Sequence, residues 1–129
     1  MKQSRKELSV AEWEIMHAIW RVGRSVTVRQ VLEAAYPRSE KAYTTVQTLM
    51  NILVEKGFLT RRKQGRINYY SAVRGREDVL RGSLIGVAQR MFQGSLGAMA
   101  SFLVSSVKLR PEELQELKRI LAEHTEESR

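Results

Sequence analysis

The segment from Ala42 to Arg62 (AYTTVQTLMNILVEKGFLTRR) constrains the fold of this chain most, because its periodicity changes at one glycine. Up to Lys56, apolar residues recur at the i, i+3, i+4, i+7 spacing of one helix face: Val46, Leu49, Met50 and Leu53. After Gly57 the spacing is that of β-strands, and residues 58–73 predict two strands about a Gln64-Gly65 turn. The segment therefore predicts a helix that leads directly into a hairpin.

Two further helices are predicted upstream, each by a capping box and an apolar stripe. The pattern S-x-x-E at Ser9 precedes a helix expected over about Val10–Val22, with both tryptophans on its core side. The pattern T-x-x-Q at Thr27 opens a second helix, which Pro37 closes. Three short helices and a hairpin make a winged helix, a variant of the helix-turn-helix. The expected fold of residues 1–75 is mainly α with a small β-hairpin wing.

The positive charge of the chain is concentrated in this first part. The 129 residues carry a net charge of +8; residues 1–75 contain 14 Lys and Arg against 6 Asp and Glu, whereas residues 76–129 contain 8 of each. A basic module followed by a neutral one suggests that only the first meets a polyanion, although a basic surface can also serve solubility alone. We therefore expect two domains, residues 1–75 and 76–129.

The predicted third helix has an unusual polar face opposite its apolar stripe. That face carries almost no charge and consists of Thr44, Gln47, Thr48, Asn51 and Glu55. Gln and Asn can pair bidentately with adenine, and Thr suits base edges and the thymine methyl group. The alternative is a solvent-facing helix whose threonines cap its start. Four cations on the adjoining hairpin favour DNA binding, because they are placed to hold phosphates or enter a minor groove: Arg61, Arg62, Lys63 and Arg66.

Beyond Gly75 the sequence predicts only helices. A long helix covers the apolar positions from Val79 to Phe92, a break at Gly94-Ser95 precedes a shorter helix, and a last helix begins at Pro111. These 54 residues are too few to bury their own helices, so we expect a second copy of the chain to cover them. The expected dimerisation residues are Leu84, Met91, Phe92, Phe102, Leu114, Leu117 and Leu121.

Several other function classes are disfavoured by composition. The absence of cysteine excludes disulfides, zinc-thiolate sites and a cysteine nucleophile, and it suits the cytoplasm. His17 and His124 have no ligand pattern near them, so we expect no metal and no cofactor. No nucleophile–base pair or phosphate-binding glycine loop is present, which argues against an enzyme. The uncharged run of residues 91–107 contains serines and glycines, so we expect no stable membrane insertion, and the basic start of the chain lacks the apolar stretch of a secretory signal.

Over nearly its whole length the sequence resembles the penicillinase and methicillin-resistance repressor family. The resemblance is carried, in the same order and spacing, by LSVAEWEIMHAIW, by AYTTVQTLMNILVEKGFLTRR with GRINYY, and by GSLGAMASFLVSS followed by LRPEELQELKRIL. It implies a homodimeric winged-helix repressor that binds an inverted-repeat operator on double-stranded DNA, with a C-terminal helical dimerisation domain. By position it assigns Arg61–Arg66 to the wing and the following residues to the recognition helix: Thr44, Thr45, Gln47, Thr48 and Asn51.

The resemblance also suggests how such a repressor leaves DNA. In several members of the family, a β-lactam sensed by a membrane-bound protease leads to cleavage of the C-terminal domain. The cleaved Asn-Phe bond matches Ser101 and Phe102 here, so the serine is a departure, and this apolar run can equally be dimer core. Ile52 is a second departure, because many relatives have Arg or Lys there. The copper-responsive branch uses C-terminal cysteines, which this chain lacks.

The sequence thus predicts a homodimeric transcriptional repressor of antibiotic resistance, and two alternatives stay open. A winged-helix module can bind protein and never read DNA; its binding would be insensitive to salt and to competition by duplex DNA. A repressor can also be released by a small-molecule ligand instead of proteolysis. The chain offers no convergent set of polar residues for such a pocket.

Overall fold

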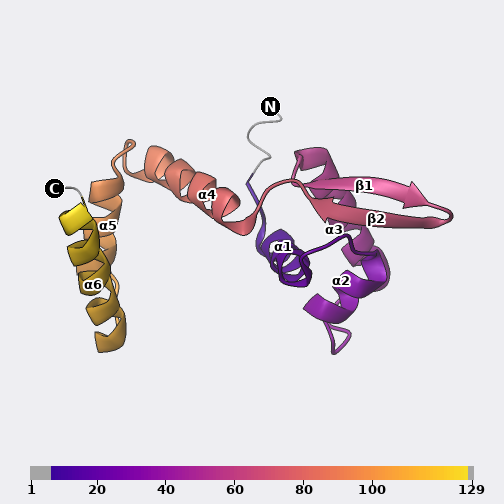
Figure 1. Cartoon of the computed structure of the whole chain (residues 1–129), viewed down its shortest axis with the longest axis horizontal. Coiled ribbons are helices and arrows are strands. Elements are labelled where there is room, and N and C mark those ends of the chain that lie inside the picture. The colour runs from indigo at the N-terminus through magenta and orange to yellow at the C-terminus, as the bar shows by residue number, and fades with distance from the viewer. Residues whose placement is uncertain (1–6, 128–129) are drawn as a thin grey trace. The chain divides into compact units, whose positions relative to one another are not determined.

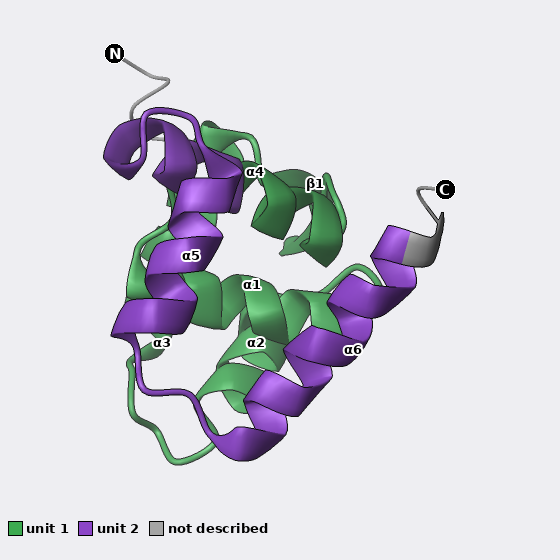
Figure 2. Ribbon diagram, turned by 90° about the vertical axis from the view of Figure 1, so that its left-hand side faces the viewer, with its two compact units in different colours: residues 1–83 green, residues 84–129 purple. Residues whose placement is uncertain are grey.

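The computed structural model describes residues 7–127, which form six helices and one antiparallel hairpin (Figure 1). In chain order the elements are α1 (Val10–Val22), α2 (Val28–Ala35), α3 (Tyr43–Lys56), β1 (Leu59–Gln64), β2 (Ile67–Ala72), α4 (Arg76–Met91), α5 (Leu96–Ser106) and α6 (Pro111–Glu127). The chain divides within α4 into two compact units, residues 1–83 and 84–129 (Figure 2). The predicted fold class is confirmed, while a domain boundary at Gly75 stays a prediction. No helix in the described range is long and apolar enough to cross a membrane.

The first two helices begin with the capping boxes that the sequence predicts. The Ser9 hydroxyl accepts the backbone N–H of Glu12 at 3.2 Å, and the Glu12 carboxylate accepts the backbone N–H of Ser9 at 2.8 Å. Thr27 and Gln30 make the same reciprocal pair at the start of α2. Because these bonds satisfy backbone N–H groups that no helical turn can reach, they fix where each helix starts.

The start of α3 differs from one alternative drawn from the sequence. Its N-terminal cap is Ala42, and no side chain accepts a hydrogen bond from the first turn. Thr44 and Thr45 therefore lie inside the helix and do not cap it, so the capping explanation for these threonines is wrong. At the other end the predicted stop is confirmed, because Gly57 adopts a left-handed conformation with φ of 89°.

The wing is a regular hairpin with a turn one residue later than predicted. Gln64 pairs with Ile67, so the two loop residues are Gly65 and Arg66, and not Gln64 and Gly65. Gly65 has φ of 65°, a conformation that costs glycine little and suits the first loop position of a tight hairpin. The shift places Arg66 at the tip of the wing.

The core of the first unit lies between α1, α2, α3 and the base of the hairpin. From α3 it takes Val46, Met50 and Leu53, as the helical stripe predicts, while Leu49 is partly buried. Of the two tryptophans expected in the core, Trp20 is half-buried and packs against it, whereas Trp13 is half-buried and lies outside it. Both rings lie against His17, with centroids 5.5 and 5.7 Å from the imidazole. Large indole rings are rarely buried completely.

A buried ion pair joins the start of α1 to the end of α3. The Lys56 ammonium lies 2.7 Å from the Glu12 carboxylate and also donates to the backbone carbonyl of Glu7 at 2.9 Å. A second polar contact joins α1 to the end of α2, where the Tyr36 hydroxyl donates to Glu14 at 2.7 Å. Burial, and then this hydrogen bond, raise the pKa of the Tyr36 phenol well above its usual range. These contacts tie the helices together by polar bonds at the edge of the apolar core.

The second unit exposes much of its apolar surface. Of the residues predicted for dimerisation, Leu84 is 54% exposed, Met91 69%, Phe102 57% and Leu121 65%, while Phe92, Leu114 and Leu117 are half-buried. The Phe92 and Phe102 rings contact each other in a tilted arrangement, with centroids 5.9 Å apart and an interplanar angle of 54°. A single copy thus leaves a large apolar surface in contact with water.

Candidate nucleic-acid interface

The polar face of α3 is accessible. Thr44, Thr45 and Thr48 are exposed, whereas Gln47 and Asn51 are half-buried. The apolar stripe on the opposite side holds the helix on the core, so Thr44, Gln47, Thr48 and Asn51 share the outer face, and Thr45 lies at its edge toward the stripe. Ile52, at the position where many relatives are expected to carry a cation, is half-buried.

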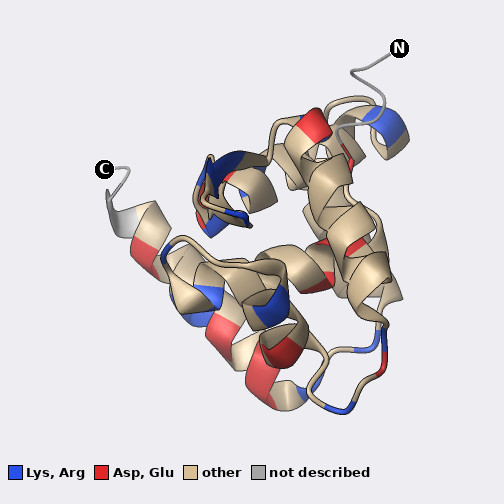
Figure 3. Cartoon of the chain, turned by 90° about the vertical axis from the view of Figure 1, so that its right-hand side faces the viewer, with Lys and Arg blue, Asp and Glu red and all other residues tan. Residues whose placement is uncertain are grey.

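The wing presents its cations to solvent. Arg61, Arg62, Lys63 and Arg66 are all exposed, and lysines and arginines are blue in Figure 3. Because side chains alternate along a strand, Arg61 and Lys63 lie on one face of β1 and Arg62 on the other. The four guanidinium and ammonium groups are therefore spread over both faces and the tip, which suits contacts with a phosphate backbone more than with a single base.

Three side chains connect the wing to α3. The Arg61 guanidinium donates to Asn51 Oδ1 at 2.7 Å, and the Tyr70 hydroxyl donates to the same oxygen at 2.9 Å. Sequence reasoning placed Asn51 and Arg61 among separate DNA contacts, and the structure brings them together. Nothing in local spacing could reveal this bond, since it depends on how the hairpin folds back over the helix.

Further polar residues near the interface were missed by sequence reasoning. A hollow of about 240 Å³ lies between the start of α2, α3 and the hairpin. Its lining comprises Thr27, Val28, Arg29, Tyr43, Gln47, Arg66, Ile67 and Asn68. The Arg29 guanidinium stands 5.3 Å from the centre of the Tyr43 ring. One feature of the sequence could have indicated Arg29. It lies in the first turn of α2, where the helix dipole disfavours a positive charge, so a cation there is better explained by a contact outside the helix.

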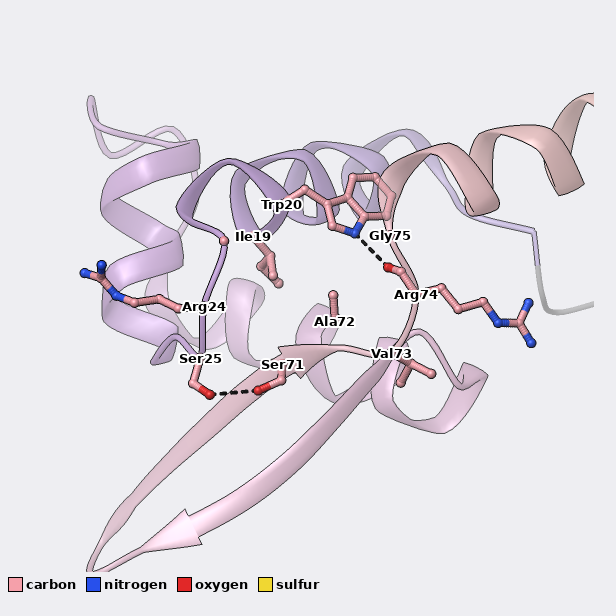
Figure 4. Close-up of a pocket in the computed structure, with 10 residues that line it drawn as sticks. Ile19, Trp20, Arg24, Ser25, Ser71, Ala72, Val73, Arg74 and Gly75 are labelled. Carbon is pink, nitrogen blue, oxygen red and sulfur yellow. Dashed lines mark hydrogen bonds between the residues drawn. The ribbon is translucent and has the colours of Figure 1, made fainter.

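A second hollow, of about 370 Å³, lies where β2 passes α1 (Figure 4). Two hydrogen bonds cross it: the Ser25 and Ser71 hydroxyls are 2.8 Å apart, and the Trp20 indole donates to the carbonyl of Arg74 at 3.0 Å. Figure 4 shows the Arg24 and Arg74 side chains pointing away from this space. These two bonds hold the base of the wing against α1 and the loop that follows it. Because they occupy the polar groups that line the hollow, the hollow does not offer a ligand a convergent set of polar groups.

Comparison with known proteins identifies the group to which this arrangement belongs. A family model described as the penicillinase repressor matches residues 8–123. The chain belongs to the penicillinase repressor family. The family resemblance drawn from the sequence is thereby confirmed.

Individual relatives match over nearly the whole chain. The chain is similar to the penicillinase repressor of Bacillus licheniformis, with 30% identity over 92% of this chain and 91% of that protein. It is 26% identical to the methicillin resistance regulatory protein MecI of Staphylococcus aureus (strain N315), over 94% of this chain and 98% of that protein. The solution structure of the DNA binding domain of the repressor BlaI matches with a TM-score of 0.50 and 30% identity, covering 57% of this chain and 88% of that domain.

Proposed function

We propose that this chain is a cytoplasmic, homodimeric transcriptional repressor that binds a pseudo-palindromic operator through α3 in the major groove and the wing on the flanking backbone. The observation that carries the proposal is the exposed, almost uncharged polar face of α3 beside four exposed wing cations. Family membership supports it, since relatives are named repressors and one solved relative is a DNA binding domain.

Within this proposal the two parts of the interface have different tasks. Thr44, Thr45, Gln47 and Thr48 face base edges, where hydroxyl and amide groups can distinguish one base pair from another. Arg62, Lys63 and Arg66 bind phosphates, which fixes position and adds affinity without sequence preference. Arg29 lines the same hollow as Gln47 and Arg66, and its guanidinium is suited to a further phosphate contact.

The exposed apolar side chains of the second unit support the homodimer. In a dimer with a two-fold axis, each copy would bury the same apolar surface against the other. The two α3 helices would then read half-sites that lie about one helical turn of DNA apart, or a multiple of it. Footprinting of the full chain on the promoter regions near its own gene tests this. Protection of an inverted repeat is expected; protection of one unrepeated half-site, or by monomers alone, would contradict the proposal.

A salt series separates DNA reading from the rival protein-binding module. A dimer making roughly 6 to 10 phosphate contacts should lose about 10³ to 10⁵ in affinity between 50 and 200 mM salt. Arg62→Ala should weaken all sequences alike and flatten this slope, while Gln47→Ala should relax preference at one base position. Selectivity that survives Gln47→Ala would show that the reading face is wrongly assigned, and salt-insensitive partner binding would favour the module.

Release from DNA by a membrane-bound sensor protease, after a cell-wall antibiotic signal, is part of the same proposal. The bond between Ser101 and Phe102 lies inside α5, where the Ser105 hydroxyl donates to the Ser101 carbonyl at 2.8 Å. A protease would need α5 to open, and a second copy packed on Phe102 would oppose that opening. Intact-mass analysis of the protein from antibiotic-treated cells is expected to show a break after Ser101; an intact chain released from DNA would favour a ligand instead.

A further inference from the structure

One carboxamide oxygen holds the recognition helix and the wing together. Asn51 Oδ1, on α3, accepts from the Arg61 guanidinium at 2.7 Å and from the Tyr70 hydroxyl at 2.9 Å. Arg61 and Tyr70 are direct cross-strand partners in the hairpin, so both donors come from one residue pair of the wing. A carboxamide oxygen has two lone pairs, and these two donors use both.

The tyrosine in this group is fixed from its other end as well. Tyr70 is 0% exposed, and its backbone N–H and C=O both pair with Val26 in the loop before α2, at 2.8 and 2.9 Å. Its ring crosses the core and places the hydroxyl against Asn51. The position of Asn51 relative to the hairpin is therefore set by a rigid, buried side chain that cannot itself touch DNA.

This geometry limits what Asn51 can offer to a base. An asparagine that selects adenine accepts from the N6 amino group through Oδ1 and donates to N7 through Nδ2. Here Oδ1 already holds two donors, one of them a charged guanidinium, so adenine would have to displace them. Only the Nδ2 amino group remains for an acceptor such as a phosphate.

We propose that Asn51 is a positioning residue, which locks the wing onto α3 through its oxygen and gives a bound duplex only a hydrogen-bond donor, without selecting adenine. The inference rests on the proposed DNA-binding function and refines it. Thr44, Thr45, Gln47 and Thr48 then carry the base preference, while Asn51 sets the angle at which the wing cations meet the backbone.

The locking contact is tested first on the free protein, by hydrogen exchange of the hairpin amides. Tyr70→Phe removes only the buried hydroxyl, and Asn51→Ala removes the shared acceptor; each should speed exchange in the hairpin by about threefold to tenfold, the effect of one or two hydrogen bonds. Asn51→Asp keeps an acceptor for both donors and should restore protection. Tyr69→Phe, on the other face of the same strand, is the matched control. Unchanged exchange in Tyr70→Phe and Asn51→Ala would overturn the inference.

Binding to operator variants then tests the consequence for specificity. Asn51→Ala and Tyr70→Phe should each lower affinity by about threefold to tenfold on every sequence, and the double variant should lose no more than Asn51→Ala alone. If Asn51→Ala instead relaxes preference for one adenine by about tenfold while Tyr70→Phe leaves it intact, Asn51 reads a base and the inference is wrong. If the unaltered chain binds no duplex, the proposed function fails, while the exchange result still decides whether Asn51 locks the wing.

Discussion

At the scale of single residues, the ion pair between Glu12 and Lys56 matters most for stability. The Glu12 side chain is only 4% exposed and the Lys56 side chain 16%, so both charges are largely removed from water. A buried pair adds little over an apolar pair of the same shape, yet losing one partner is costly because the other charge stays buried. The two partners differ in this respect, since a long lysine near the surface can reach solvent and Glu12 cannot.

We therefore predict an asymmetry between two substitutions. Lys56→Met leaves the buried Glu12 carboxylate with only the Ser9 amide, and should lower the free energy of unfolding by about 3 kcal/mol. Glu12→Gln keeps the capping bond and lets Lys56 turn outward, so its cost should be about 1 kcal/mol. Urea unfolding followed by tryptophan fluorescence measures this well, because both tryptophans lie on α1. Equal losses in the two variants would contradict the argument.

Residue-scale contacts also show where sequence reasoning ends. The capping boxes, the stop at Gly57 and the buried stripe of α3 could be predicted, because each depends on residues within one or two helical turns. The pairing of Glu12 with Lys56, and of Asn51 with Arg61 and Tyr70, could not, because each bond joins elements that meet only when the chain is folded.

At the scale of elements, the wing depends on one glycine. Gly65 has φ of 65°, and a Cβ added there would meet no atom within 4 Å, so the whole cost of a side chain is backbone strain. Gly65→Ala should destabilise the hairpin by about 1 kcal/mol and speed exchange of its amides. Gly75→Ala is the matched control, because its surroundings are equally open and no left-handed φ is required. Similar exchange in both variants would show that the turn is not strained.

The start of α6 predicts a dependence on pH. The backbone N–H of Arg110, and then its guanidinium, donate to Glu113 and hold the pKa of that carboxyl below its usual range. A lowered pKa in the folded state means that this stabilisation is present at neutral pH and is lost as pH falls through the folded-state value. The first turn of α6 should therefore fray in acid, as hydrogen exchange of its amides would show.

Two neutral variants isolate that effect. Glu113→Gln can still accept the Arg110 amide but carries no charge, so it should remove much of the acid dependence of α6 while lowering its protection at neutral pH. Glu112→Gln removes a carboxylate from the same first turn and loses only its favourable interaction with the helix dipole. It should therefore leave most of the acid dependence in place. Acid dependence in Glu113→Gln equal to that of the unaltered chain would assign the fraying to other groups.

At the scale of the whole molecule, affinity for an operator should depend on the apolar surface of the second unit. If two copies join there, binding of one α3 helix to its half-site brings the second α3 helix close to the other half-site. The second helix then binds at an effective concentration far above that of free protein. Phe102 is 57% exposed in one copy and its ring lies against Phe92, so it is suited to the centre of such an interface. Tight binding to a full operator would then require the second unit, although that unit need not touch DNA.

Phe102→Glu tests this dependence without changing any residue of the proposed interface with DNA. A symmetric dimer of this variant would bury two unpaired carboxylates, so the dissociation constant of the dimer should rise about a hundredfold or more. Analytical sedimentation measures this constant. Affinity for the full operator should fall toward that for an isolated half-site, and half-site affinity should not change. Gln115→Glu adds the same charge at an exposed position of α6 and should leave both affinities intact. A dimer that persists in Phe102→Glu would place the subunit contact elsewhere. An equal loss of affinity on the half-site would show that the substitution disturbs DNA binding by a single copy, which would contradict the argument.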